Sequence, residues 1–349
     1  NEMADFWSVA LSPVAINKFF HTVLSGWIVG ALFVSGVCGW YLLKGRERRF
    51  SLSSLRIAAV FGLVASILLA WTGDGSAYQV AQRQPMKLAA MEGLYEGENG
   101  AGLIAIGLLD PKKQSYNDGV EPFLFELKIP KALSVLATRD ADAFVPGIAD
   151  LIEGGYKNAD GSIALSAVEK RERGKEAIQA LADYRQAKES NDQEAAGRHL
   201  ERLENNFPYF GYGFIANVND LIPPIGLTFY SFHIMVLLGG YFILLFVVVL
   251  YYGRRERLAS AKWLQYVLVW SIPLGYIAGQ AGWIVAEVGR QPWAIQDLLP
   301  TNAAISALET SSVQVTFFLF LALFTILLFA EIRIMVKAIR KGPEMSTND

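Results

Sequence analysis

Two side chains that can bind a haem iron lie inside apolar stretches long enough to span a membrane. His21 belongs to a run that ends at Leu43, and Met235 belongs to a run over residues 226–252. An ionisable side chain surrounded by hydrocarbon is energetically costly, so by default it marks a functional site. A histidine and a methionine that bind one haem iron favour a high-potential electron-transfer centre. The pair therefore predicts electron transfer within the membrane.

The two residues lie at similar depths. His21 follows Pro13 by eight residues and Met235 follows Pro224 by eleven, which gives depths of ~12 and ~16 Å at the rise of a helix. Small residues near the pair leave room for a flat macrocycle: Ser25, Gly26, Gly30, Gly239 and Gly240. The simpler interpretation is that the methionine packs and that the small residues serve helix contacts.

His233 is a rival of Met235 for the second ligand position. The two residues are two positions apart, so on a helix they face different directions and cannot both bind one iron. Spacing alone does not choose between a His21/His233 pair and a His21/Met235 pair.

A second group of polar residues follows the second apolar run. In a helix, Lys87 and Glu92 are separated by about 500° of rotation and stand about 140° apart, so they would flank a site rather than form an ion pair. A carboxylate beside a quinol headgroup could accept its proton, and a lysine could orient a ring oxygen. Ordinary surface charge is the simpler alternative.

A third group lies at the end of the fourth apolar run. Trp283 and Glu287 are four residues apart, on one face of a helix, and Arg290 follows closely. The planar guanidinium of arginine can bind a carboxylate such as a haem propionate through two hydrogen bonds. A glutamate near the membrane is costly unless it is paired or takes part in proton transfer. The same residues could also be a plain interfacial anchor.

Apolar runs must position these residues. Hydrophobic residues make up 53% of the 349-residue chain, and each run is near the ~20 residues that cross a bilayer. The runs are residues 17–43, 55–73, 226–252, 263–286 and 312–336. The predicted fold class is an all-α membrane protein with about five transmembrane helices and a large extracytoplasmic loop domain that contains charged helices. The net charge of −2 gives no indication of a nucleic-acid partner.

Basic residues predict the orientation of these runs. They cluster in residues 44–56, 254–262 and 333–341, and five alternating spans place all three clusters on one side. The positive-inside rule makes that side cytoplasmic. The N-terminus and the loop regions 75–222 and 287–311 then face outward.

The expected organisation has four parts. They are two transmembrane helices in 1–74, the extracytoplasmic region 75–222, three transmembrane helices in 223–341 and a cytoplasmic tail in 342–349. The second half of region 75–222 has apolar residues at three-to-four spacing among many charges, which predicts a solvated helical hairpin broken near residues 190–192.

These strings together resemble subunit I of cytochrome bd-type quinol oxidases. The matching stretches are Asn17–Val23, Trp40–Arg46, Lys87–Ala90 with Glu92, parts of Ile129–Arg139, and Ala281–Trp293. The Gly-Arg-Gln-Pro-Trp core of the last stretch is highly specific to that family. The resemblance covers nearly the whole chain.

The resemblance implies roles for the candidate haem residues. His21 and Met235 look like the axial ligands of a low-spin haem b, which favours Met235 over His233. His233 stands where the family often has arginine, so the charge that arginine would provide is in doubt here. Trp283, Glu287 and Arg290 look like residues around the haems, with Trp283 between haem groups and Glu287 near the high-spin pair.

The resemblance also implies a quinol site. Lys87 and Glu92 look like quinol-binding residues of the family's outward Q-loop, which would be region 75–222 in its long form. The family's subunit has about nine spans, and this chain resembles the last five. The residues that hold the high-spin haem b and haem d would belong to the front part. We therefore expect either a fragment of a longer subunit or an N-terminal half that is a separate partner chain.

The resemblance thus implies a terminal respiratory oxidase of the bacterial cytoplasmic (inner) membrane. Quinol would be oxidised at the outer face, and electrons would pass through haem b toward haem d, where oxygen is reduced to water. Expected partners are quinol, oxidase subunit II, the N-terminal half of subunit I, membrane lipid and a small accessory subunit. Ubiquinol and menaquinol are equally compatible with the sequence. Two alternatives stay open: a b-type electron relay without oxygen chemistry, and a non-redox membrane transporter, which predicts no haem.

Overall fold

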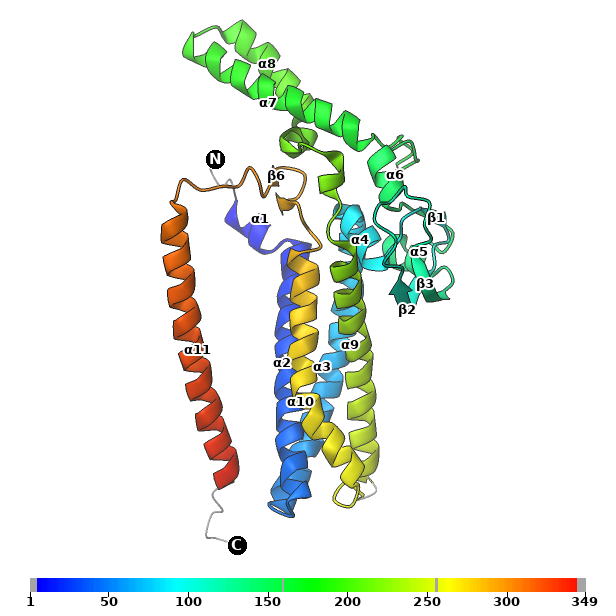
Figure 1. Ribbon diagram of the computed structural model, residues 1–349, viewed down its shortest axis with the longest axis vertical. Helices are drawn as coiled ribbons and strands as arrows, with labels where there is room; N and C mark the ends of the chain where they lie inside the picture. The colour runs from blue at the N-terminus through cyan, green and yellow to red at the C-terminus, as the bar shows by residue number, and fades with distance from the viewer. Residues whose placement is uncertain (1–4, 159, 255–256, 344–349) are drawn as a thin grey trace. The chain divides into compact units, whose positions relative to one another are not determined.

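Five long helices dominate the computed structural model, which describes residues 5–158, 160–254 and 257–343 (Figure 1). Within that described part, they are α2 (Pro13–Leu43), α3 (Arg48–Arg83), α9 (Ile225–Arg254), α10 (Lys262–Glu287) and α11 (Thr310–Lys341). Each is long and apolar enough to cross a membrane. Backbone N–H and C=O groups have no water to bind in hydrocarbon, so a helix, which pairs them internally, is the form that such runs adopt. The predicted spans and the all-α membrane class are confirmed.

The helices extend beyond the predicted runs. α3 starts at Arg48 and continues to Arg83, past the expected boundary at residue 74. Its last turns therefore stand outside the apolar run and lead directly to Pro85, where the next helix begins.

The chain forms two compact units. The first comprises Asn1–Ser25, Ser66–Tyr241 and Tyr276–Ala304, and the second comprises Gly26–Ala65, Phe242–Gly275 and Ile305–Asp349. All candidate site residues belong to the first unit.

The first unit contains helix ends and the polar region between α3 and α9. Its other helical elements are α1 (Phe6–Ala10), α4 (Pro85–Glu92), α5 (Ala132–Thr138), α6 (Ile148–Glu153), α7 (Ala167–Glu189), α8 (Gln193–Asn206), η1 (Phe207–Phe214) and η2 (Val218–Leu221). Its strands are β1 (Glu98–Asn99), β2 (Leu103–Leu109), β3 (Phe123–Ile129), β4 (Phe144–Val145), β5 (Trp293–Ile295) and β6 (Leu299–Pro300).

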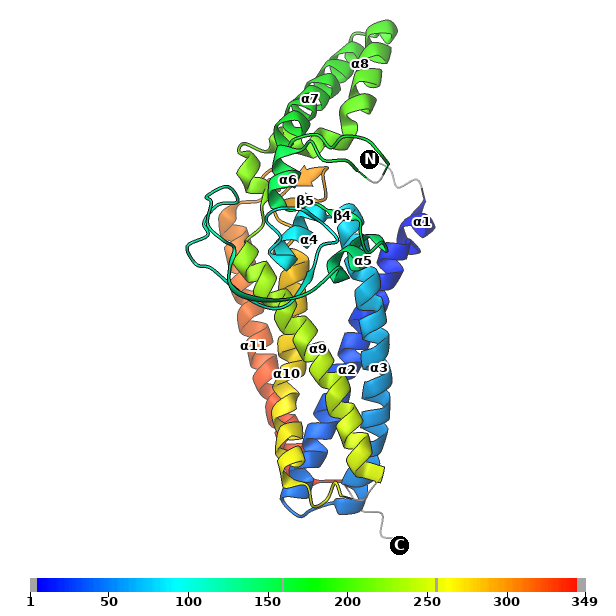
Figure 2. The same cartoon turned by 90° about the vertical axis from the view of Figure 1, so that its right-hand side faces the viewer.

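The predicted helical hairpin is present as α7 and α8, which run side by side (Figures 1 and 2). Ser166 and Glu169 form a capping box at the start of α7, and Asp192 caps α8. Ala177 and Ala180 of α7 are fully buried against Leu203 of α8. The break at residues 190–192 lies where it was expected.

The strands were not predicted. They pair antiparallel as β1–β4, β2–β3 and β5–β6, and each strand has between two and seven residues. Such short pieces lack the alternation of apolar and polar residues that marks a half-buried strand. The β2–β3 pair has a register shift between Ile104 and Ile106.

The second unit is built by close helix contacts. A Cβ on Gly36 of α2 would collide with Ile272 of α10, and a Cβ on Gly39 would lie 3.1 Å from the Leu268 side chain. Small residues of this kind let membrane helices approach closely. The end of α11 is tied to α2 by the Tyr41 hydroxyl, which donates a hydrogen bond to Ile339 O at 2.8 Å.

Candidate functional site

Helix α4 brings both predicted quinol residues into the interior of the first unit. Pro85 starts the helix, where its missing N–H has no intrahelical partner to lose. Gly93 ends it in the left-handed conformation, with φ of 62°. Six of its eight residues are buried, including Lys87 and Glu92. A lysine and a glutamate are almost never buried without a reason, so α4 carries more than surface charge.

Lys87 lies against the end of α10. Its Nζ donates a hydrogen bond to Ala286 O at 3.3 Å, and a Cβ on Gly289 would lie 3.3 Å from Lys87 Cε. Burial lowers the pKa of the Lys87 ammonium to about 8, and the nearby charges of Lys18 and Arg290 act in the same direction. Lys87 is therefore a partly desolvated cation beside the third predicted group.

Glu92 is more deeply buried and only half satisfied. Its side chain is 1% exposed, and Oε2 accepts a hydrogen bond from Ile104 N at 3.4 Å. Oε1 is buried with no hydrogen-bond partner among the described residues. Burial raises the pKa of the Glu92 carboxyl to about 8, against the smaller opposite effect of the Ile104 N–H. A buried polar atom without a partner needs an explanation, and a bound ligand is one.

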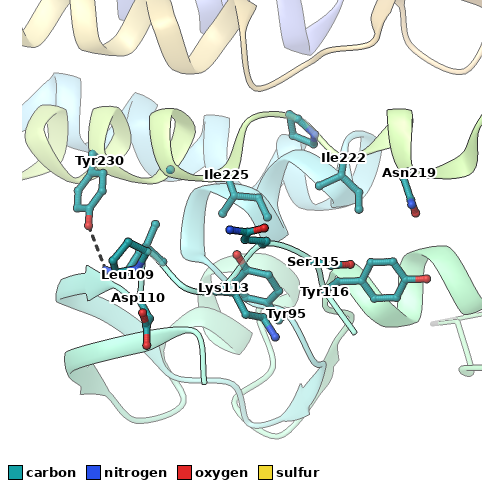
Figure 3. Close-up of a pocket in the computed structure, with 14 residues that line it drawn as sticks. Tyr95, Leu109, Asp110, Lys113, Ser115, Tyr116, Asn219, Ile222, Ile225 and Tyr230 are labelled. Atoms are coloured by element: carbon teal, nitrogen blue, oxygen red, sulfur yellow. Dashed lines mark hydrogen bonds between the residues drawn. The ribbon is translucent and has the colours of Figure 1, made fainter. Parts of the chain in front are cut away.

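Two cavities that share part of their lining lie near Glu92, and one of them is lined by Glu92 itself. One, of about 570 Å³, is lined by Glu92 and Ile104. The other, of about 550 Å³, lies between the start of α9 and the loop after β2, with Tyr230 and Leu109 on its wall (Figure 3). Both are lined by Tyr95, Lys113 and Tyr116. Volumes of this size suit a small organic ligand.

The third predicted group is only partly assembled. Arg290 donates a hydrogen bond from Nη2 to Glu287 Oε2 at 2.6 Å, and its buried Nε has no partner among the described residues. Trp283 is 65% exposed. The structure thus brings Glu287, Arg290 and Lys87 together and leaves Trp283 on the surface of the described chain.

His21 has one ring nitrogen engaged and one available. Its Nδ1 lies 3.0 Å from the Thr72 hydroxyl of α3, and that hydroxyl donates to Leu69 O at 3.0 Å. A hydroxyl has a single proton, so here it can only accept from His21, and Nδ1 carries the hydrogen. The Nε2 lone pair is then free for a metal, in the arrangement that orients most metal-binding histidines.

Met235 contacts the facing helix. A Cβ on Gly282 of α10 would lie 2.9 Å from Met235 Sδ, so this glycine makes room for the sulfur. A Cβ on Gly239 or Gly240, one turn further along α9, would meet nothing within 4 Å. His21 is thus held by a contact with α3, and Met235 of α9 packs against α10.

A comparison with protein families shows which family the chain belongs to. The model of the family described as cytochrome bd terminal oxidase subunit I matches residues 1–343. The chain belongs to this family.

Relatives and a solved structure agree with the bd oxidase family. The chain is 36% identical over 344 residues to cytochrome bd-II ubiquinol oxidase subunit 1 of Escherichia coli (strain K12), covering 98% of this chain and 65% of that protein. It is 29% identical over 345 residues to cytochrome bd ubiquinol oxidase subunit 1 of Bacillus subtilis (strain 168), with coverage of 98% and 60%. The bd oxidase structure from Geobacillus thermodenitrificans has the same fold, with a TM-score of 0.65 at 24% identity and coverage of 97% and 61%. The chain therefore spans 60–65% of the length of these proteins.

The haem that the bd oxidase family implies fits the donor set of this chain. His21 presents a free Nε2 lone pair because Thr72 holds the other nitrogen. Met235 offers a thioether beside glycines 239 and 240, where a Cβ would find open space. Arg290 has a buried N–H that meets no acceptor in the described part of the chain, which suits a carboxylate such as a propionate.

His233, the rival ligand, has both nitrogens occupied in this bd oxidase chain. Nδ1 lies 2.8 Å from Phe229 O, and Nε2 lies 2.8 Å from Ile104 O. The side chain is 8% exposed. Each ring nitrogen of His233 thus faces a backbone carbonyl oxygen.

Sequence reasoning missed the residues that support these groups. Thr72, which fixes the His21 tautomer, is a hydroxyl inside an apolar run, and that signal was available. Asn17, whose amide donates to Thr72 O at 3.0 Å and to Ser76 Oγ at 2.8 Å, gave a similar signal. Ile104 gave none, because its backbone rather than its side chain contacts Glu92 and His233.

Proposed function

We propose that this chain is the quinol-oxidising, electron-accepting part of a bd-type terminal oxidase. Quinol is oxidised at the outer face of the bacterial inner membrane, and the complete oxidase uses the electrons to reduce oxygen to water. Each quinol loses a pair of electrons and a pair of protons, and two quinols supply one O2. The observation that carries the proposal is the Glu92 carboxylate, buried on a cavity wall with one oxygen unpartnered.

Glu92 is the proton acceptor in this proposal. Once ionised, its Oε1 has a free lone pair for the hydroxyl proton of a quinol. A pKa near 8 places the group close to a physiological pH, which is where a general base is most effective. The Ile104 N–H holds Oε2, so the carboxylate keeps its direction while Oε1 exchanges the proton.

Lys87 orients the substrate from the other side of α4. Its ammonium has one hydrogen bond, to Ala286 O, and so has further donors to offer a ring oxygen. Its depressed pKa, about 8, reflects burial, and burial strengthens the interaction of its charge with the developing negative charge on the quinol oxygen.

His21 and Met235 would hold the iron of a low-spin haem b, and Arg290 would bind a propionate. When bound, that haem supplies a reversible one-electron carrier, and by family resemblance a high-spin haem b and haem d supply the oxygen chemistry elsewhere in the assembly. Thr72 keeps His21 in the tautomer that a metal requires. Glu287 pairs with Arg290 and keeps its guanidinium in place.

The full activity belongs to an assembly. The chain spans 60–65% of its relatives, so subunit II, the remaining part of subunit I and membrane lipid are proposed partners. Region 75–222 faces the periplasm as the Q-loop, and the basic clusters and the C-terminus face the cytoplasm. Family membership favours this redox function over a membrane transporter.

A reduced-minus-oxidised absorption spectrum of the assembled oxidase tests the haem assignment. His21→Ala and Met235→Ala should each remove the low-spin b-type signal or turn it high-spin. His199→Ala, on the α7–α8 hairpin, and Met335→Ala, on α11, are matched controls that should leave the spectrum unchanged. A parent spectrum without a b-type signal would refute the proposal. A parent with the signal but without quinol-dependent oxygen uptake would support an electron relay instead.

A further inference from the structure

One face of α9 holds strand β2 along its whole length. His233 follows Tyr230 by three residues and Phe229 by four, so it lies on the same side of the helix as both. The Tyr230 hydroxyl accepts a hydrogen bond from Leu109 N at 3.0 Å, at the end of the strand (Figure 3). His233 Nε2 lies 2.8 Å from Ile104 O, near its start. We call these three residues the β2 clamp.

The middle of the strand is held by packing. A Cβ on Gly107 would lie 2.9 Å from Phe229 Cζ, so the ring rests directly on the strand backbone. Phe229 also packs against Phe123 of β3, with ring centroids 5.6 Å apart. The α9 face thus contacts the β2–β3 pair at three successive points.

His233 is itself firmly placed. Its ring stacks on Phe229 with centroids 4.0 Å apart, and its Nδ1 lies 2.8 Å from Phe229 O. Carbonyl oxygens only accept and a neutral imidazole has one N–H, so His233 donates to Ile104 O in the tautomer that carries its hydrogen on Nε2. Buried and stacked, His233 holds Ile104 from a fixed point on α9.

Ile104 connects the clamp to Glu92. Its C=O accepts from His233, and its N–H donates to Glu92 Oε2 at 3.4 Å. The other edge of β2 is occupied by β3. Because Glu92 Oε1 has no partner, this single N–H is what directs the carboxylate among the described residues. The position of Ile104 therefore decides where Oε1 points.

We propose that His233 and Tyr230 are positioning residues of the quinol site, which act through strand β2 on the Glu92 carboxylate. The proposal rests on the proposed function, because it takes Glu92 as the proton acceptor. Met235 follows His233 by two residues, so one helix carries both a predicted haem ligand and the support of the proton acceptor.

The test compares His233→Leu with His233→Gln in the assembled oxidase. Leucine keeps apolar bulk but removes the donor, so Ile104 loses its tether and Glu92 its aligned N–H. We expect kcat for quinol oxidation to fall about tenfold with a nearly unchanged KM. The midpoint of the acid limb of the pH profile should rise by about half a pH unit, because the lost hydrogen bond from Ile104 N–H favoured the ionised Glu92 carboxylate. Glutamine keeps an N–H donor and should restore both.

Controls separate this proposal from the underlying function. Glu92→Gln identifies the acid limb that belongs to Glu92, since the other charged groups on the cavity are unchanged: Glu96, Glu98, Lys113, Glu121, Glu126 and Lys128. His199→Leu on the surface hairpin should behave as the parent. Tyr230→Phe removes only a hydroxyl and should shift the same limb by less, so it tests the clamp even where His233→Leu fails to assemble.

Three results would be decisive against the proposal. Parental kcat and pH profile in both His233→Leu and Tyr230→Phe, with Glu92→Gln inactive, would overturn the positioning role and leave the proposed function standing. Parental turnover in Glu92→Gln would remove the proposed function itself. A change of the low-spin haem signal to high-spin in His233→Leu would make His233 an iron ligand instead of a positioning residue.

Discussion

At the scale of single residues, Glu92 Oε1 is the atom that most constrains the chemistry. A buried carboxylate with an unpartnered oxygen is costly when ionised, which is why the pKa of this group rises to about 8. As a base it works only when ionised, so quinol oxidation should rise with pH through about 8 and fall below it. Steady-state rates of the assembled oxidase between acid and alkaline pH would measure this limb.

Replacement of the same residue gives a second measurement. Glu92→Gln keeps size and removes the base, so kcat should fall by about 10²–10⁴-fold, the range that a positioned base contributes. Glu98→Gln is the matched control: its carboxylate lies on the wall of the same cavity and is about half exposed. Equal losses in the two variants would show that the cavity's overall charge, and not Glu92, sets the rate.

Thr72 offers a test of the haem ligand that leaves both ligands intact. Thr72→Val removes the oxygen that accepts from His21 Nδ1, so the ring loses its fixed tautomer and orientation. Haem retention should weaken about 10- to 100-fold, as for other partners of metal-binding histidines. The rate at which haem transfers to a scavenging apoprotein would measure this loss of haem retention. Thr22→Val, whose hydroxyl donates only to Lys18 O one turn back, should match the parent.

The sequence was informative about these residues to different degrees. His21 stood out because an ionisable side chain inside an apolar run is costly. Lys87 and Glu92 were compatible with ordinary surface charge, and the resemblance gave them a role at the quinol site. The burial of Glu92 was not predictable, since it depends on Ile104, twelve residues later, and on the α9 face that holds the strand. Residue spacing left His233 and Met235 open as ligands, the resemblance favoured Met235, and the backbone contacts of the His233 imidazole were visible only in three dimensions.

At the scale of elements, a membrane-spanning helix depends on one continuous run of apolar residues, so the five long helices could be predicted from such runs alone. The α7–α8 hairpin followed from helical spacing and a polar break. The β2–β3 pair did not, because the contacts that hold β2 come from side chains of α9 and α4, which its own residue pattern does not indicate. The proposed quinol site lies where these two kinds of element meet.

The hairpin has a local prediction of its own. Gly174 of α7 lies so close to the backbone of Gly213 in η1 that any Cβ would collide. Gly174→Val should therefore loosen the hairpin at a cost of about 1–3 kcal/mol. Hydrogen exchange of α7 and α8 would report it as faster exchange. Gly197→Val on α8, where a Cβ meets nothing within 4 Å, should change exchange much less; equal effects would point to helix propensity rather than contact.

At the scale of the whole molecule, orientation links the site to energy conservation. In the proposed function, protons released by quinol on one side and protons consumed by oxygen on the other would separate charge without a pump. This requires α4 and β2 to face outward and the basic clusters to face inward. This orientation is inferred from the basic clusters by the positive-inside rule, and an experiment can measure it directly.

Cysteine labelling of intact cells provides it. Ser190→Cys, at the exposed end of α7, should react with a membrane-impermeant maleimide from outside. Ser260→Cys, in the loop between α9 and α10, should react only after permeabilisation. The natural Cys38 is 1% exposed, so the background should be low. Labelling of Ser260→Cys from outside would reverse the topology, and quinol oxidation would then release its protons to the cytoplasm, which removes the basis for charge separation in this oxidase.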